Sequence, residues 1–101
     1  MRDVVPSKGG VPIRLTSERW AHIVEEHNEL AGMRFEVLET VSDPERIVAG
    51  SAGELLALHE QAPGRWLVVV YRELGSDGFV ITAFLTGRIE TLTRRRQLWP
   101  A

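Results

Sequence analysis

Hydrophobic residues in the first third of the chain recur at helical spacing. The positions i, i+3, i+4 and i+7 of one helix face are filled by Trp20, Ile23, Val24 and His27. Thr16 precedes this stretch as a candidate N-cap, and Glu18 places a negative charge in the first turn, where the helix dipole favours it. We therefore expect a first helix that begins after Thr16 and ends near residues 28–32.

A second helix is predicted directly after the first. Val37, Leu38 and Val41 form its buried stripe, and the helix stops at Ser42-Asp43-Pro44 because proline disfavours helical backbone in the residue before it. Ahead of both helices, the Ser-Lys-Gly-Gly sequence at 7–10 indicates a turn, and residues 11–15 are a candidate edge strand.

From residue 45 onward the pattern changes to that of β-strands. Strands are expected at 46–49, 55–60, 66–73 and 79–86, with turns at 62–64 and 75–78. Helices that precede strands indicate an α+β fold, because parallel βαβ units would need the two to alternate. We predict one domain over residues 1–101, with two N-terminal helices packed on one face of a four- to five-stranded antiparallel sheet.

The second hairpin gives an expected register. A turn centred on residues 76 and 77 pairs Leu74 with Phe79, Arg72 with Ile81, and Tyr71 with Thr82. Alternation then divides the side chains between two faces. The helices are expected to cover Arg72, Phe79, Ile81, Ala83 and Leu85, while the open face carries Tyr71, Thr82 and Thr86. A three-residue loop would shift this pairing by one residue.

Composition and charge narrow the class of protein. The 101 residues include no cysteine, which excludes disulfides and thiolate sites and fits a reducing cytoplasm. No apolar run resembles a signal peptide or a membrane span, so we expect a soluble cytoplasmic protein. The net charge of −2 counts against a general nucleic-acid binder. Arginines nevertheless gather near the C-terminus, at positions 88 and 94–96.

The candidate acid–base residues are two histidines of the first helix. His22 and His27 are five residues apart and point about 140° away from each other, which does not suit a metal site. No metal and no cofactor are expected. His27 is either a packed histidine bonded to a carbonyl or a group that exchanges protons near neutral pH. His22 lies off the apolar stripe, one turn from Glu26, and has the same two interpretations.

Hydroxyl and guanidinium groups supply the remaining candidates. Tyr71, Thr82 and Thr86 are either ordinary strand residues or hydroxyls presented to a phosphate or a base. Arg72 and Arg88 are either solvated surface charges or phosphate ligands, and the second interpretation requires both to converge on the open face.

Two stretches resemble a known family. The Leu-Thr start with Trp-x-His-Ile-x-x-x-His in residues 15–29, and Phe-Val-Ile-Thr-Ala-x-x-Thr in residues 79–86, look like small phage and toxin proteins of the barnase–EndoU–colicin–RelE-like nuclease group. The resemblance extends from Ile13 to the closing Leu98-Trp99. It implies a metal-independent ribonuclease that activates the ribose 2′-hydroxyl. His22 and His27 match the motif histidines, and Thr82 and Thr86 match the strand threonines.

Three functional hypotheses follow. The first is a toxin-type endoribonuclease that acts on RNA and is held by an antitoxin protein, with His22, His27 and Thr82 catalytic and Tyr71, Arg72, Thr86 and Arg88 binding substrate. A helix packed on one face must then deliver its histidines round the sheet edge, which favours His22. The second is a non-catalytic interaction module of the same fold, with a homodimer or a partner bound through exposed tryptophans. Its motivation is the net acidity and the Ala-Leu-His at 57–59, where the related proteins carry tyrosine and arginine. The third is a small-molecule-binding domain that uses the open face.

Overall fold

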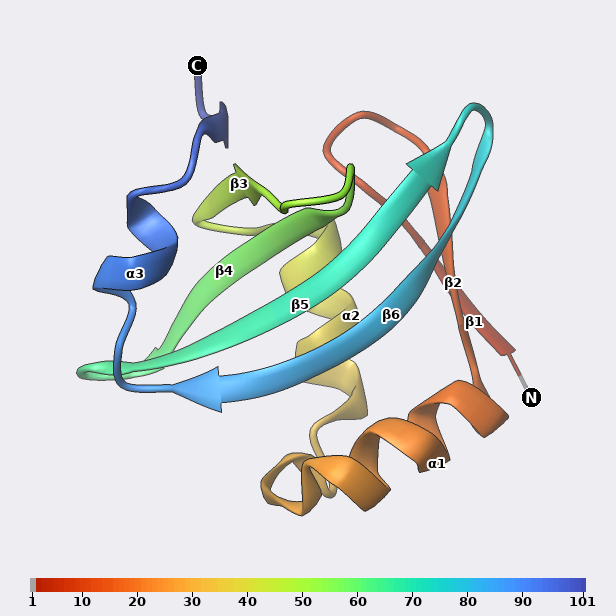
Figure 1. Ribbon diagram of the computed structural model, residues 1–101. Helices are drawn as coiled ribbons and strands as arrows, with labels where there is room; N and C mark the ends of the chain where they lie inside the picture. The colour runs from red at the N-terminus through yellow and green to blue at the C-terminus, as the bar shows by residue number, and fades with distance from the viewer. Residues whose placement is uncertain (1) are drawn as a thin grey trace.

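The computed structural model describes residues 2–101, which fold around a seven-stranded sheet (Figure 1). The N-terminal elements are β1 (Arg2–Pro6), β2 (Pro12–Thr16), α1 (Ser17–Glu26), the 3-10 turn η1 (Asn28–Leu30) and α2 (Arg34–Ser42). The sheet continues with β3 (Arg46–Ala49), β4 (Leu55–Ala62), β5 (Arg65–Leu74) and β6 (Asp77–Thr86). The chain closes with α3 (Glu90–Thr93) and β7 (Gln97–Trp99).

The predicted four- to five-stranded antiparallel sheet with two N-terminal helices on one face is wrong. The strand order is β1-β2-β6-β5-β4-β3-β7, and β2 runs parallel to β6. The additional strands come from the two ends of the chain: β1 and β2 form a hairpin, and β7 pairs with β3. A third helix, α3, packs on the sheet face that the prediction left open. The β2–β6 and β3–β7 pairings join residues far apart in sequence, so no local pattern predicts them.

Both predicted helices form, and their ends follow the local signals. The Thr16 side chain accepts a hydrogen bond from the Arg19 amide at 3.0 Å, which confirms it as the N-cap of α1. The helix ends at Glu26, slightly earlier than expected, and the His27 amide donates to the Ile23 carbonyl at 2.7 Å. Helix α2 ends at Ser42, before Asp43-Pro44, as predicted.

The predicted register of the β5–β6 hairpin is wrong, because the turn is centred on Gly75 and Ser76 and a bulge follows farther along the pair. Leu74 pairs with Asp77, Arg72 with Phe79 and Tyr71 with Val80, across a turn at Gly75 whose φ is 64°. The register shifts beyond Tyr71, so Val70 pairs with Thr82. Tyr71 and Thr82 consequently lie on opposite faces of the sheet.

Each face of the sheet carries its own hydrophobic cluster. The helix face, which contacts α1 and α2, includes Leu67, Val69, Tyr71, Val80 and Ala83. The opposite face carries Leu56, Leu58 and Val68, with Trp66, Val70 and Phe84 packed beside them and α3 covering one part through Ile89 and Leu92. Ala83 and Leu85 lie on the helix face as predicted. Arg72 and Phe79 were expected on the helix face but lie on the opposite one, and Tyr71 was expected on the open face but lies on the helix face.

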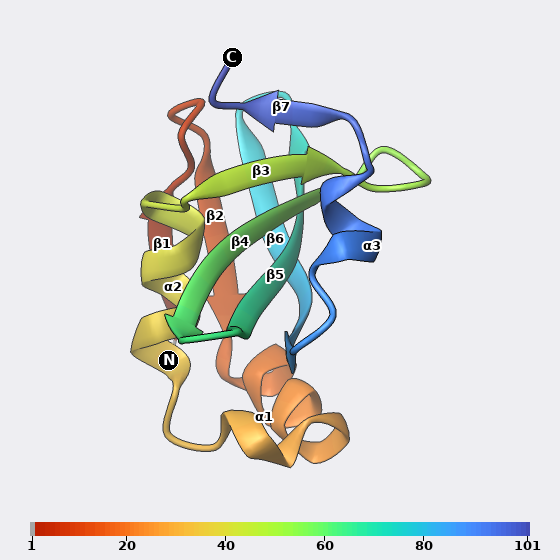
Figure 2. The ribbon, with the colours of Figure 1, turned by 90° about the vertical axis from the view of Figure 1, so that its left-hand side faces the viewer.

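The sheet curls until its two ends meet. Although β1 and β7 are its terminal strands, the Lys8 ammonium in the turn after β1 lies 4.6 Å from the centre of the Trp99 ring in β7. Figure 2 shows β7 lying beyond β3, close to the turn between β1 and β2. Within residues 2–101, no helix is long and apolar enough to cross a membrane.

Candidate functional site

His27 stands where α1 ends against the free part of β6. Strand β2 pairs with β6 only at Gly78 and Phe79, so the rest of that edge faces α1 and η1, which contact it (Figure 1). The His27 ring centroid lies 6.1 Å from that of Phe84, with the two planes tilted by 38°. Since Phe84 belongs to the opposite face, His27 reaches round the sheet edge and approaches that face from the side.

The surroundings of His27 leave the imidazole accessible. Its side chain is 34% exposed, and Nδ1 lies 3.7 Å from a carboxylate oxygen of Glu29. This distance is an ion-pair contact and too long for a hydrogen bond. The Glu29 carboxylate lies on the Nδ1 side of the ring, which leaves Nε2 to meet a substrate.

Two threonines flank Phe84 on the same face. Side chains of a strand alternate, so Thr82, Phe84 and Thr86 all project from the opposite face. The Thr82 hydroxyl is buried and has no hydrogen-bond partner among the described residues, while the Thr86 hydroxyl accepts from the Arg88 amide at 3.0 Å. We call His27, Thr82, Phe84 and Thr86 the edge site. A buried hydroxyl without a partner costs free energy, which is a reason to look for function there.

His22 and Tyr71 do not join the edge site. His22 is exposed, lines a shallow hollow beside Thr16 and Arg19, and pairs with Glu26 at 3.6 Å as its spacing predicts. Tyr71 is completely buried on the helix face. It is therefore His27, the histidine on the apolar stripe, that reaches the sheet edge.

The two candidate arginines lie at different distances from the edge site. Arg88 is exposed and lies two residues after the strand end at Thr86. Arg72 shares the face but lies four residues along β5 from Val68, the partner of Phe84, which is roughly 13 Å. Its Nη2 donates to the Ala52 carbonyl at 3.0 Å.

The loop that holds Arg72 also carries a carboxylate. Backbone amides, including that of Ala52 at 2.7 Å, hold the pKa of Glu54 below its ordinary value, and the charges of Arg72 and Arg95 act in the same direction. Arg72 is thus engaged with the loop between β3 and β4, whereas Arg88 has its guanidinium at the surface beside the edge site.

Sequence reasoning did not single out Phe84 or Glu29. Phe84 is an ordinary strand residue by pattern, and its contact with His27 joins two elements 57 residues apart in numbering. Among residues 2–101, no three His, Asp or Glu side chains are grouped so that they could hold a metal ion. No protein-family model, no curated protein and no solved structure matches this chain.

Proposed function

We propose that this protein is a metal-independent endoribonuclease of the toxin type, with the edge site as its catalytic centre. The observation that carries the proposal is the position of His27, which places an accessible imidazole beside the sheet face that bears Thr82 and Thr86. A second supporting observation is the Thr82 hydroxyl, which has no hydrogen-bond partner among the described residues, because a phosphate oxygen would supply the acceptor it lacks.

The reaction needs a base, donors for the phosphate and a cation. The His27 imidazole removes the proton of the ribose 2′-hydroxyl, the 2′-oxygen bonds to phosphorus, and the bond from phosphorus to the 5′-oxygen breaks. The departing 5′-oxygen takes up a proton from solvent, and a 2′,3′-cyclic phosphate remains. The Thr82 and Thr86 hydroxyls donate to the non-bridging oxygens, where negative charge accumulates in the transition state.

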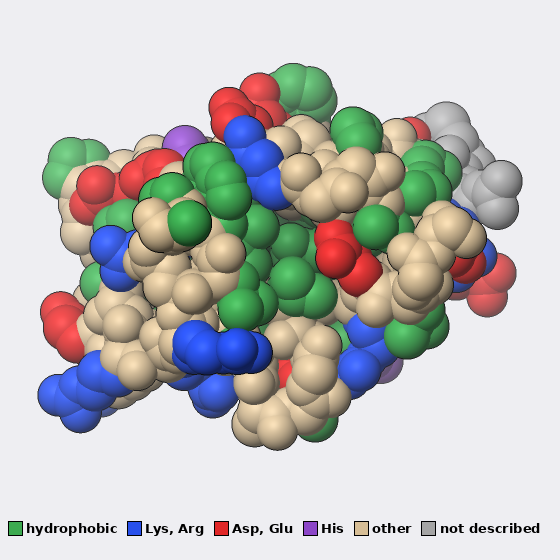
Figure 3. All heavy atoms as spheres, turned by 90° about the horizontal axis from the view of Figure 1, so that it is seen from above, with side chains coloured by type: hydrophobic (Ala, Val, Ile, Leu, Met, Phe, Trp, Pro, Cys, Tyr) green, Lys and Arg blue, Asp and Glu red, His purple; other side chains and the backbone are tan. Residues whose placement is uncertain are grey.

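Exposed arginines lie close to the edge site and farther along the chain. Although the net charge is −2, Arg88 lies two residues after Thr86, and Arg94, Arg95 and Arg96 follow α3, all with exposed side chains. Several Lys and Arg side chains lie toward the α3 side of the molecule in Figure 3. We infer that Arg88 contacts the scissile phosphate, while Arg72, roughly 13 Å away along β5, meets a more distant phosphate of the same strand.

The likeness of residues 15–29 and 79–86 to the barnase–EndoU–colicin–RelE-like group supports the same proposal from the sequence side. It extends the proposal to a cytoplasmic toxin whose activity an antitoxin protein restrains. In this proposal Tyr71 has no contact with substrate at the edge site, because it is buried on the other face of the sheet.

Cleavage of RNA by matched variants tests the proposal. The purified protein is incubated with total RNA and with tRNA in EDTA, beside His27→Ala, His22→Ala and Thr82→Val. We expect His27→Ala to lower the cleavage rate by at least about 100-fold, the usual contribution of a general base. Thr82→Val is isosteric and removes only the hydroxyl, so a loss of about tenfold or more is expected from one missing charge-stabilising donor.

His22→Ala and His59→Ala are the controls, since the chain has three histidines and these two lie away from the edge site. Both are expected to cleave within about threefold of the parent, as substitutions outside the reacting groups usually have small effects. Absence of cleavage by the folded parent, or full activity in His27→Ala, would refute the proposed centre.

A second candidate function, an interaction module, has its own supporting observation. Strand β1 ends the sheet. Its residue Val4 is 48% exposed, and Phe35 of the neighbouring α2 is 69% exposed. The three tryptophans are all partly buried, so they do not form the exposed surface that the sequence suggested. An apolar surface beside an unpaired strand edge suits pairing with β1 of a second copy.

Light scattering on Phe35→Ser tests this homodimer. A dimer of the parent that Phe35→Ser converts to a monomer is expected, because the substitution removes the largest exposed ring on that surface. Leu74→Ser is the matched control, since Leu74 is 56% exposed at the end of β5 and does not belong to the surface of Val4 and Phe35. A parent that stays monomeric at high concentration excludes the homodimer.

A further inference from the structure

A cavity of about 240 Å³ lies where the curled ends of the sheet meet. Its apolar walls are Ile47, Leu55, Leu98 and Trp99, which come from β3, β4 and β7. Figure 3 looks toward this end of the molecule, and hydrophobic side chains gather at the centre of the view. The cavity is on the helix-face side of β5, because Tyr71 forms part of its lining.

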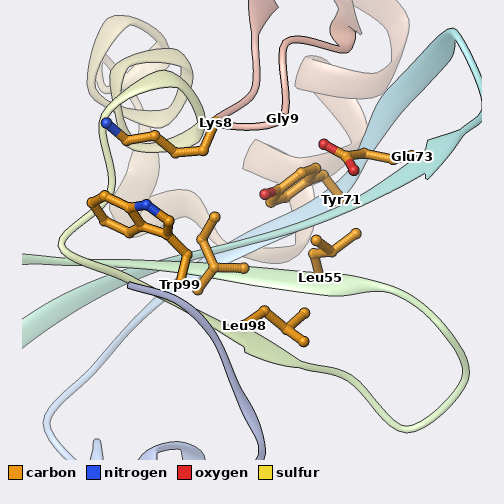
Figure 4. Close-up of a pocket in the computed structure, with 8 residues that line it drawn as sticks. Lys8, Gly9, Leu55, Tyr71, Glu73, Leu98 and Trp99 are labelled. Atoms are coloured by element: carbon orange, nitrogen blue, oxygen red, sulfur yellow. The ribbon is translucent and has the colours of Figure 1, made fainter. Parts of the chain in front are cut away.

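The Tyr71 hydroxyl is the unexplained polar group of this cavity. The oxygen exposes less than 1 Å² and has no hydrogen-bond partner among residues 2–101. Figure 4 shows the hydroxyl pointing toward Trp99 and Lys8. Buried hydroxyls in folded proteins nearly always have a partner, so this one points to an acceptor that comes from outside the chain.

The turn between β1 and β2 closes over the cavity. The Ser7 hydroxyl donates to the Glu73 carboxylate, which fastens the turn to β5. The Lys8 ammonium rests on the Trp99 ring at 4.6 Å and lies 3.6 Å from the Asp43 carboxylate. Lys8 is partly exposed and holds these contacts with a flexible side chain, so it can leave Trp99 without disturbing the sheet.

We propose that this cavity binds a small neutral aromatic molecule carrying one hydrogen-bond acceptor, with the acceptor bonded to the Tyr71 hydroxyl and the ring beside Trp99. Lys8 is the cover: it swings off Trp99 when the ligand enters, and the hydroxyl beneath becomes reachable.

Size and charge define the ligand class. A cavity of about 150 Å³ holds benzene, so one of about 240 Å³ has room for a single ring with a small substituent. The acceptor must be neutral, since the Glu73 carboxylate lines the same cavity and repels an anion. Burial, aided by Glu73, raises the pKa of Tyr71, which keeps the phenol protonated as a donor.

This site is separate from the edge site. His27 contacts Phe84 on the opposite face, whereas Tyr71 belongs to the helix face, and the cavity is bounded by β7 and the β1–β2 turn. The inference is independent of the proposed ribonuclease activity, and failure of either leaves the other intact.

Acetophenone and ethylbenzene are the probes, because each is a single ring with a two-carbon substituent and only acetophenone carries an acceptor. Each is titrated into isotope-labelled parent, Tyr71→Phe and Lys8→Ala, and the assigned Trp99 indole N–H resonance is followed. We expect acetophenone to bind the parent about five- to tenfold more tightly than ethylbenzene, the usual effect of one hydrogen bond. Tyr71→Phe should remove this difference, leaving ethylbenzene binding unchanged within about twofold. Lys8→Ala should tighten binding of both probes, since the cover no longer has to be displaced.

Either of two results would overturn the inference. One is a Trp99 resonance that neither probe moves up to its solubility limit. The other is equal binding of the two probes to the parent, which decides the question even if Tyr71→Phe proves poorly folded. Weaker binding to Lys8→Ala would show that the lysine contacts the ligand and would refute its role as a cover.

Discussion

Tyr71 is the single tyrosine of the chain, and folding buries it completely. The low-dielectric surroundings disfavour the phenolate, and the nearby Glu73 carboxylate disfavours it further, so the pKa of Tyr71 lies above its ordinary value of 10.0. A raised pKa means that the folded state holds this proton more tightly than the unfolded state. The resulting stability is complete below pH 10.0 and is lost as the pH rises toward the folded-state pKa.

An alkaline titration tests this description of Tyr71. With one tyrosine present, the phenolate absorbance reports this residue alone. We expect the absorbance to appear only well above pH 10.0 and together with loss of circular dichroism, because ionisation requires the ring to leave the core. Tyr71→Phe should unfold at a higher pH than the parent. A phenolate that appears near pH 10.0 in folded protein would contradict the burial.

At the level of elements, one arginine joins β1, β2 and α2. Arg34, the first residue of α2, donates from Nε to the Asp3 carboxylate in β1 at 2.6 Å and from Nη2 to the Leu15 carbonyl in β2 at 3.2 Å. The Arg34 and Asp3 side chains are only 22% and 34% exposed, so solvent screens the pair less than a fully exposed one. The N-terminal hairpin is thereby fastened to α2.

Arg34→Met should lower the free energy of unfolding by about 1–3 kcal/mol, the range for a hydrogen bond to a charged group. Methionine keeps much of the hydrophobic stem, so the loss reports the polar contacts. The measurement is urea denaturation. Arg19→Met is the control, because Arg19 is an exposed residue of α1. Equal effects of the two substitutions would mean that the Asp3 and Leu15 contacts contribute nothing.

For the whole molecule, the parallel junction between β2 and β6 is the joint that unites the hairpin with the rest of the sheet. Gly78 pairs with Ile13 across this junction and with Glu73 on the other side. A methyl group on Gly78 would collide with the Arg72 carbonyl oxygen and with Ile13 Cδ1. The carbonyl belongs to the neighbouring backbone and cannot move aside without shifting β5, so the close approach of strands requires glycine here.

Gly78→Ala is expected to cost about 2–3 kcal/mol of stability, as overpacking in a tightly packed core does. Gly87→Ala is the matched control, because its added methyl would meet only the Gly64 carbonyl oxygen at an ordinary 3.6 Å. Thermal unfolding of both variants makes the comparison. A Gly78→Ala protein as stable as the control would show that the junction relaxes freely.

The candidate site was only partly predictable from the sequence. The helical spacing placed His27 on the apolar stripe of α1, and this position predicted a packed residue. Its contact with Phe84 depends on where β2 stops pairing with β6, which leaves an edge for α1 to occupy. Tyr71 was assigned to the wrong face because a bulge in β6, opposite Val70 and Tyr71, reverses the alternation, and no residue of the strands marks the bulge.

The sequence by itself determined the local elements. The Thr16 cap and the break before Pro44 set the helix ends, and β-branched runs with turn residues between them set β3 to β6, since these preferences act over a few neighbouring residues. Only the tertiary structure decided the parallel β2–β6 junction, the addition of β7, the bulge and the meeting of Lys8 with Trp99. Each of these depends on contacts between distant segments, whose partners are chosen by packing of the whole chain.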